Sequence, residues 1–252
     1  MSDFNVNSSK GGKTTWPISL GGCGCLMLIG LVIALVLPAV FSAKQSARRM
    51  QCSNQLKEIT LALHAYHDVY KSLPPAYTTD ADGKPLHSWR VLILPFIEEQ
   101  RLYDQIRLDE SWDSEHNRQF HNQIPRVYLC PTANSDAWVK GATSYMRLMG
   151  PGTTTNGPDT VTLKEVTAGK NSVFWLVEVI PTTCWMEPVD VRVNELAGDF
   201  QFSRESGVGS MHKGGLYHND RGTNICYLNG SVCFMPDHAA YQLKDLGRIK
   251  KQ

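Results

Sequence analysis

The sequence predicts an α+β protein in which a long N-terminal helix precedes a domain rich in β-strands. Three observations support this fold class. A charge-free apolar segment lies near the N-terminus, apolar residues then recur at helical spacing, and a hairpin signal surrounds Asn229-Gly230 near the C-terminus. The 252 residues suffice for one domain of ordinary size with an additional segment.

The N-terminal segments have sharply different compositions. Residues 1–17 are polar and rich in Gly, Ser and Lys, which predicts a disordered cytoplasmic tail. No charged residue lies between Lys13 and Lys44, and about 20 apolar residues cross a bilayer as a helix. We therefore predict a transmembrane helix over residues 18–41, in which Pro38 is tolerated.

Two processing events are alternatives to a permanent membrane helix. A signal peptide has a shorter apolar core and a cleavage site of small residues, and Ala39-Val40-Phe41 is a poor cleavage site. Lipid modification of Cys23 is the second alternative, but the lipoprotein-like string Leu20-Gly21-Gly22-Cys23 lies before the apolar run rather than after it. We expect the helix to be retained.

The helical pattern continues beyond the membrane segment. One apolar stripe at three-and-four spacing consists of Leu56, Ile59, Leu63, Tyr66 and Tyr70. Leu73-Pro74-Pro75 ends the pattern, because a residue before proline leaves the helical region. We predict that residues 42–73 extend the membrane helix into the soluble domain, which occupies residues 74–252.

Local patterns predict further elements in this domain. Residues 89–107 have a helical pattern interrupted by Pro95, and residues 127–130 fit a short strand. Residues 150–159 are rich in Gly, Thr, Asn and Pro and predict a loop. The string SVFWLVEVI, residues 172–180, predicts a buried strand because it is rich in β-branched and aromatic side chains.

A β-hairpin is predicted over residues 224–235. A two-residue loop at Asn229-Gly230 would pair Leu228 with Ser231 and place Cys226 opposite Cys233. Cross-strand neighbours lie within disulfide reach, so these two cysteines could be bridged or could simply pack as small side chains.

The remaining cysteines include a second candidate pair, Cys52 and Cys130, whose separation the sequence does not give. No Cys-x-x-Cys pair lies outside the membrane segment, which argues against a zinc site.

Composition and motifs disfavour most catalytic classes. The 25 basic and 24 acidic residues leave a net charge of +1, so no strong field recruits nucleic acid. Phosphate-binding and dinucleotide motifs are absent, and so is a Gly-x-Ser-x-Gly elbow. His64 with His67 lacks an evident third metal ligand, and the oxygen-rich loop around Asn219 lacks carboxylate density. We therefore expect no enzymatic activity, no cofactor and no metal.

Several strings nevertheless resemble one bacterial family. They are LPAVFSAKQSARRMQCSNQLKEITLALHAYHD (37–68), SWRVLILPFIEEQRLYDQI (88–106), SWDSEHN (111–117), YLCPT (128–132), TSYMRLMGPGT (143–153), CWMEPVDV (184–191) and GSMHKGG…TNICYLNGSVCFM (209–235). In this order they resemble the planctomycete prepilin-like family called domain of unknown function 1559, known for an H-X9-DG C-terminal motif. His212 corresponds to the motif histidine and Asn229-Gly230 to its Asp-Gly.

The resemblance implies a type IV pilin-like fold, with a long N-terminal transmembrane helix packed on an antiparallel β-sheet domain outside the cytoplasmic membrane. It implies no established enzymatic activity, while an older family label suggests solute binding. This sequence departs from the pattern at two places. No prepilin junction is evident and no Asp or Glu occurs between Asp3 and Glu58, which argues against cleavage and polymerisation. The C-terminal motif also has a longer spacer and Asn in place of Asp.

We therefore expect a single-pass protein of the inner membrane with its soluble domain in the periplasm or outside. The expected function is that of a non-enzymatic, pseudopilin-like structural or assembly protein of the cell envelope, as in systems like type II secretion. Its expected partners are the lipid bilayer and other pilin-like subunits, through the N-terminal helix. The alternative is a membrane-tethered solute- or polysaccharide-binding module. It would use the loops over residues 151–158 and 212–222 and the tryptophans, namely Trp89, Trp112, Trp138, Trp175 and Trp185.

Overall fold

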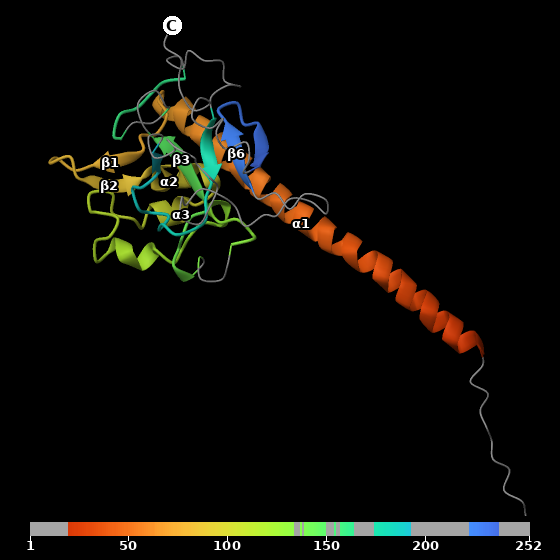
Figure 1. The fold of residues 1–252 in the computed structure, drawn as a ribbon. Coiled ribbons are helices and arrows are strands. Elements are labelled where there is room, and N and C mark those ends of the chain that lie inside the picture. The colour runs from red at the N-terminus through yellow and green to blue at the C-terminus, as the bar shows by residue number, and fades with distance from the viewer. Residues whose placement is uncertain are drawn as a thin grey trace, which may run out of the picture. The chain divides into compact units, whose positions relative to one another are not determined.

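A computed structural model describes residues 20–133, 137, 139–149, 154, 157–163, 174–192 and 222–236. The helices are α1 (Leu20–Tyr70), α2 (Trp89–Leu92) and α3 (Gln100–Tyr103), with 3-10 helices η1 (Leu94–Ile97), η2 (Asn117–Phe120) and η3 (Arg126–Tyr128). The strands are β1 (Tyr77–Thr79), β2 (Pro85–Ser88), β3 (Tyr145–Met149), β4 (Phe174–Glu178), β5 (Val191–Arg192), β6 (Gly222–Tyr227) and β7 (Val232–Pro236). Figure 1 shows their arrangement. The predicted tail, residues 1–17, lies outside the described residues.

Helix α1 includes a segment that is long and apolar enough to cross a membrane, by length and composition. Side chains from Met27 to Phe41 are exposed, with Met27 at 73% and Phe41 at 64% exposure. A charge-free helix with apolar side chains on every face is typical of a membrane-spanning segment. The chain divides into two compact units, residues 1–43 and 44–252.

Within the second unit, α1 becomes a core helix. Cys52, Leu56, Ile59 and Leu63 have no exposed surface, as the apolar stripe predicts. Tyr66 packs against the core only partly, and Tyr70 is exposed, so the stripe fades toward the helix end. The helix ends at Tyr70 rather than at the predicted residue 73, because Lys71 takes a left-handed φ of 61°.

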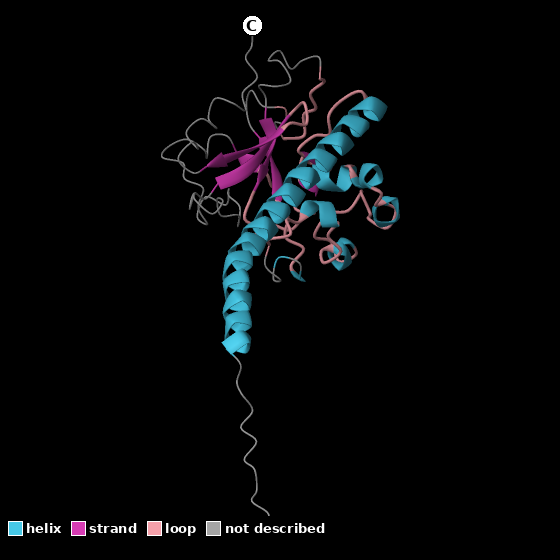
Figure 2. Ribbon diagram, turned by 90° about the vertical axis from the view of Figure 1, so that its right-hand side faces the viewer, coloured by secondary structure: helices cyan, strands magenta, loops and turns pink. Residues whose placement is uncertain are grey.

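The main sheet has five strands in the order β5-β3-β4-β6-β7. All neighbours are antiparallel except β3 and β5, which are parallel. Strand β3 is buried at every residue, a pattern typical of a strand covered on both faces. Figure 2 shows the second half of α1 lying across this sheet. The predicted α+β class is therefore confirmed, and the arrangement is compatible with a pilin-like fold.

Two predicted elements differ from the structure. Residues 89–107 form three short helices, α2, η1 and α3, because Pro95 removes a backbone donor and Glu98 takes a left-handed φ of 64°. Residues 127–130 were predicted as a strand, and this was wrong. Residues 127 and 128 belong to the 3-10 helix η3, and the side chains of Val127 and Tyr128 are apolar because they enter the core.

The hairpin forms where the sequence places it, but the predicted two-residue loop is wrong. The Tyr227 N–H donates to the Ser231 carbonyl oxygen at 2.8 Å, so residues 228–230 form a three-residue loop. Only Gly230 in this loop has a positive φ, 83°, which fits a type I turn followed by a glycine bulge. The Asn229 carboxamide oxygen accepts from Ser231 N at 2.9 Å and stabilises this geometry.

This extra loop residue shifts the strand register by one. Cys226 lies opposite Val232, and Cys233 lies opposite Ile225. Because successive side chains on a strand point to opposite faces, Cys226 and Cys233 do not face each other.

The Gly230→Ala variant tests the turn. An added Cβ would lie 3.8 Å from Thr60 Cγ2, an ordinary contact, so the expected destabilisation comes from the left-handed backbone alone. We expect the free energy of unfolding to fall by about 1–2 kcal/mol. Denaturant unfolding measures this, with Asn229→Asp as the matched control, because aspartate keeps the side-chain acceptor. An unchanged stability of the alanine variant would contradict the bulged turn.

Candidate functional site

The polar groups beneath α1 gather where β3 and β4 face the helix. Tyr145 on β3 pairs in register with Glu178 on β4. Residues paired across an antiparallel ladder point to the same face, so both side chains lie beneath α1. The Tyr145 hydroxyl donates to Gln55 Oε1 on α1 at 2.8 Å. Burial raises the pKa of Tyr145 well above its ordinary value, so the hydroxyl remains a donor at any physiological pH.

A disulfide joins α1 to the segment that precedes β3. Cys52 and Cys130 are bonded, with their Cα atoms 5.3 Å apart and a sequence separation of 78. This is one of the two cysteine pairs considered from the sequence. Only the fold shows that Cys52 and Cys130 lie close together. The side chains are 0% and 3% exposed, so the bond is closed to solvent.

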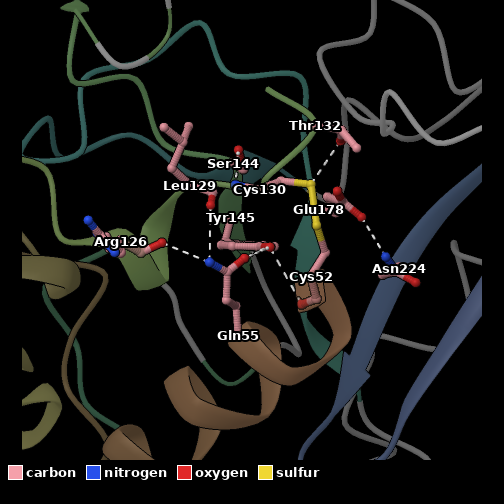
Figure 3. Close-up of a disulfide and its surroundings, with 10 residues drawn as sticks. All are labelled: Cys52, Gln55, Arg126, Leu129, Cys130, Thr132, Ser144, Tyr145, Glu178 and Asn224. Carbon is pink, nitrogen blue, oxygen red and sulfur yellow. Dashed lines mark hydrogen bonds between the residues drawn. A yellow bond between two sulfur atoms is a disulfide. The ribbon is translucent and has the colours of Figure 1, made fainter. Parts of the chain in front are cut away.

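Hydrogen bonds surround this disulfide and attach the same turn of α1 (Figure 3). Gln55 Nε2 donates to the carbonyl oxygens of Arg126 at 2.8 Å and Leu129 at 3.1 Å. The Cys130 N–H donates to Ser144 Oγ at 2.9 Å. Helix α1, the η3 segment and the sheet are therefore joined at one place by a covalent bond and by several hydrogen bonds, of which the one from Cys130 N–H to Ser144 is buried.

A buried carboxylate lies beside the disulfide. Glu178 is 1% exposed and accepts from Asn224 Nδ2 at 2.7 Å. One ligand atom each from Cys52, Cys130 and Glu178 lie within 4.8 Å of one another. Thr132 Oγ1 lies 3.0 Å from Cys130 Sγ, which adds a hydroxyl to the cluster. Figure 3 shows the Glu178 side chain next to the sulfur atoms.

Further along α1, the helix contacts the hairpin. Thr60 Oγ1 lies 3.1 Å from Cys226 Sγ, and His64 Nε2 lies 2.8 Å from the Leu228 carbonyl oxygen. The hairpin loop that contains Asn229 and Gly230 thus lies against helix α1. Burial raises the pKa of the Cys226 thiol to about 11.

Of the two alternatives for Cys226 and Cys233, a bridge or two packed thiols, the structure shows two free thiols. The register shift explains this, since the two side chains lie on opposite faces of the hairpin. We expect N-ethylmaleimide to alkylate Cys233, which is partly exposed, much faster than Cys226, which is buried and remains protonated at pH 8. Mass spectrometry of timed digests checks this order. A peptide in which the two cysteines are bridged would contradict the observed register.

A second buried cluster joins α2 to β3 and to the segment before β5. Arg90 Nη2 lies 2.8 Å from Asp190 Oδ1, and both side chains are almost completely buried. Trp89 Nε1 donates to Asp190 Oδ2 at 2.9 Å, and the Arg147 N–H donates to Oδ1 at 3.1 Å. Burial raises the pKa of Asp190, an effect that the adjacent Arg90 and Arg147 charges oppose.

Arg147 adds a second buried cation to this cluster. Its Nη1 donates to the Pro74 carbonyl oxygen at 2.8 Å, and its guanidinium lies near the rings of Trp89 and Trp175, at 5.7 and 5.9 Å from their centroids. Burial lowers the pKa of Arg147 to about 10, so it remains charged at neutral pH. The guanidinium of Arg90 is therefore paired with the Asp190 carboxylate, whereas that of Arg147 is compensated by carbonyl oxygens and by the two tryptophan rings.

Sequence reasoning did not find this cluster. The available signal was a charged residue with apolar neighbours on both sides, as at Arg90 and Arg147. Such isolated charges in an apolar run indicate buried, partnered groups. Their partner, Asp190, lies far along the chain, so only the fold identifies it.

Other candidate residues have simpler positions. His212, Asn219 and Asp220 lie outside the described residues, whereas Thr223 and Asn224, the other two members of the oxygen-rich loop, lie in strand β6. Among the described residues, potential metal ligands come together at Cys52, Cys130 and Glu178, and neither His64 nor His67 belongs to that group. Three tryptophans proposed for a sugar-binding surface, Trp89, Trp175 and Trp185, have no exposed surface and serve the core.

Comparison with known proteins gives one match. Residues 41–177, just over half of the chain, match the family described as a protein of unknown function (DUF1559). The match ends before the C-terminal motif residues His212, Asn229 and Gly230. No curated protein and no solved structure matches the chain. The matched segment contains the second half of α1, both cysteines of the disulfide, and strands β1 to β4 except the last residue of β4. Because the match covers more than half of the sequence, the chain belongs to the DUF1559 family.

Proposed function

We propose that this protein is a membrane-anchored, non-enzymatic, pseudopilin-like structural or assembly protein of the cell envelope. One observation carries the proposal: a single helix, α1, is apolar and exposed over its first half and is a core element of the domain over its second half. Such a helix couples a bilayer to a folded domain without a flexible linker. The proposed partners are the lipid bilayer and other pilin-like subunits through α1, as in systems like type II secretion.

The disulfide supports an exported domain. Disulfides persist in oxidising compartments and are rare in the cytosol. A bond between Cys52 and Cys130, buried and linking α1 to the sheet domain, fits a soluble domain in the periplasm or outside the cell. The proposed location is therefore the inner membrane, with the tail of residues 1–17 in the cytoplasm.

A non-enzymatic role is supported by how the polar residues are used. In the described part of the chain, the largest buried charged cluster, formed by Arg90, Asp190 and Arg147, joins structural elements through mutual hydrogen bonds. The second polar cluster contains a disulfide and a buried carboxylate. Both clusters tie secondary-structure elements together, as expected of a scaffold.

Cysteine accessibility tests the proposed topology. We define a two-cysteine background in which Cys23, Cys25, Cys184, Cys226 and Cys233 are replaced by serine. In it, Val139→Cys places a thiol on the domain at a side chain that is 69% exposed, and Ser8→Cys places one in the tail. Intact spheroplasts treated with a membrane-impermeant maleimide should label the first variant at once and the second only after permeabilisation. The reverse pattern would contradict the topology.

The retained helix is tested by the N-terminus of the mature protein. Because no acidic residue lies between Asp3 and Glu58, we expect no pilin-type processing. N-terminal sequencing of the membrane-purified protein should find no cleavage within the helix. A mature chain beginning within residues 21–26 would contradict a permanent anchor and support pilin-type maturation.

A membrane-tethered solute- or polysaccharide-binding module is the second candidate. The observation in its favour is that three buried polar atoms have no hydrogen-bond partner among the described residues: Arg147 Nε, Thr154 Oγ1 and Trp175 Nε1. Buried donors without partners are unusual and favour a polar ligand with acceptor oxygens. Thermal-shift screening against small carboxylates tests this function, with Arg147→Lys as the comparison variant. Stabilisation of both proteins by the same amount, or of neither, would remove its support.

A further inference from the structure

The disulfide, the adjacent carboxylate and the neighbouring hydroxyl form a ligand set that the proposed scaffold role does not require. Cys52 comes from α1, Cys130 follows η3 and Glu178 ends β4, so three separate elements bring these groups together. All three residues are buried. Asn224 Nδ2 donates to Glu178 Oε2 at 2.7 Å and holds this carboxyl group beside the two sulfur atoms. Two sulfurs and one carboxyl oxygen within 4.8 Å of one another are a donor set that could hold a metal ion.

We infer that the reduced form of this site binds a thiophilic divalent cation of the Zn²⁺ class through Cys52, Cys130 and Glu178. Two thiolates and one carboxylate suit Zn²⁺ rather than Mg²⁺ or Ca²⁺, which prefer oxygen ligands only. The same residues thus form a covalent link when oxidised and a metal link when reduced. In both states, α1 remains attached to the sheet domain.

A dithiol reductant can convert the Cys52–Cys130 disulfide into the metal-binding form in a balanced reaction. The reductant gives two electrons and two protons to the sulfur atoms, the S–S bond breaks, and the dithiol becomes a disulfide. The cation then displaces the two thiol protons, which pass to solvent, and binds the two thiolates together with the existing Glu178 carboxylate. The protein and the reductant exchange no other atoms.

The geometry allows this change with small side-chain movements. Around a tetrahedral zinc ion with Zn–S bonds of about 2.3 Å, two sulfur ligands stand about 3.8 Å apart. The three ligand atoms already lie within 4.8 Å of one another, so they can surround one ion without backbone rearrangement. The fourth position can be taken by the Thr132 hydroxyl, which is 3.0 Å from Cys130 Sγ.

Asn224 supplies an outer contact typical of metal sites. Its Nδ2 donates to Glu178 Oε2 at 2.7 Å and fixes the orientation of the carboxylate. Outer partners that orient a ligand raise metal affinity. Asn224 is therefore a positioning residue for the proposed ligand Glu178.

Cobalt titration of the full-length protein in detergent tests the inference. The two-cysteine background is reduced with a phosphine, which does not compete for metal, and Co²⁺ is added. We expect one equivalent of Co²⁺ to give tetrahedral visible bands and thiolate charge-transfer absorption, both lost on addition of Zn²⁺. The oxidised protein should give neither. Absence of these bands from the reduced protein would overturn the inference, whatever the variants do.

Matched variants assign the third ligand. Glu178→Gln keeps a side chain that accepts from Asn224 and should weaken Co²⁺ binding at least about 10-fold, because even outer-shell changes reduce metal affinity 10- to 100-fold. Glu187→Gln makes the same charge change away from the site and should leave affinity unchanged. In the oxidised state, Glu178→Gln should leave the Tm nearly unchanged, because glutamine has almost the same shape and keeps an oxygen that accepts from Asn224. Equal Co²⁺ affinity of the Glu178→Gln variant and the parent, or a large loss of Tm in the oxidised variant, would overturn the role of Glu178 as a ligand.

Discussion

Replacing Cys52 and Cys130 together by serine should lower the free energy of unfolding by about 4 kcal/mol. The reason is the size of the closed loop: the bond links residues 78 apart and removes much of the conformational freedom of the unfolded chain. Thermal unfolding in the presence of a chelator, followed by circular dichroism, measures the change, and the chelator excludes stabilisation by bound metal.

Cys184→Ser is the matched control for this prediction. It replaces a partly buried free thiol and closes no loop, so we expect a much smaller effect on the Tm. If the double variant and the control unfolded at the same temperature, the disulfide would not be a main support of the domain.

Arg90→Met should destabilise the domain by about 3–5 kcal/mol, because removing one partner of a buried ion pair leaves the other charge unpaired. The remaining Asp190 is almost completely buried and would keep only the Trp89 and Arg147 N–H donors. Urea unfolding of the purified protein measures the loss.

The ion pair between Arg107 and Glu110 provides the matched control. It has the same 2.8 Å separation, but Arg107 is 56% exposed. Arg107→Met should therefore leave the unfolding midpoint within experimental error, since water screens exposed pairs. Adding Asp190→Leu to the Arg90→Met variant should recover part of the lost stability. A loss for Arg90→Met no larger than that for Arg107→Met would contradict a structural role for the buried cluster.

The helix and the hairpin strands were predictable because their signals are local. The charge-free segment, the stripe at Leu56, Ile59 and Leu63, and the β-branched string around Trp175 each depend on near neighbours in sequence. The hairpin register was not predictable in the same way. Asn-Gly fits a two-residue turn and a bulged three-residue turn, and the choice depends on contacts of Asn229 with Ser231.

The candidate site was less predictable because its members are far apart in the chain. Cys52 and Cys130 could be named as a pair but not placed together, and Glu178 gave no sign of being their neighbour. Strands β1, β2 and β5 have two to four residues each and are too short for a periodic signal. Arg90, Arg147 and Asp190 required the tertiary fold, because a buried charge is recognised only with its partners.

The central claim is that a membrane-anchored helix is bonded to a sheet domain in an oxidising compartment. It is tested most directly by acid-quenching cells, alkylating free thiols with N-ethylmaleimide and mapping the peptides of the membrane fraction by mass spectrometry. The account predicts a bridged peptide pair containing Cys52 and Cys130, with Cys226 and Cys233 each carrying the alkyl group. Recovery of Cys52 and Cys130 as fully alkylated thiols, or of the protein in the soluble fraction, would contradict it.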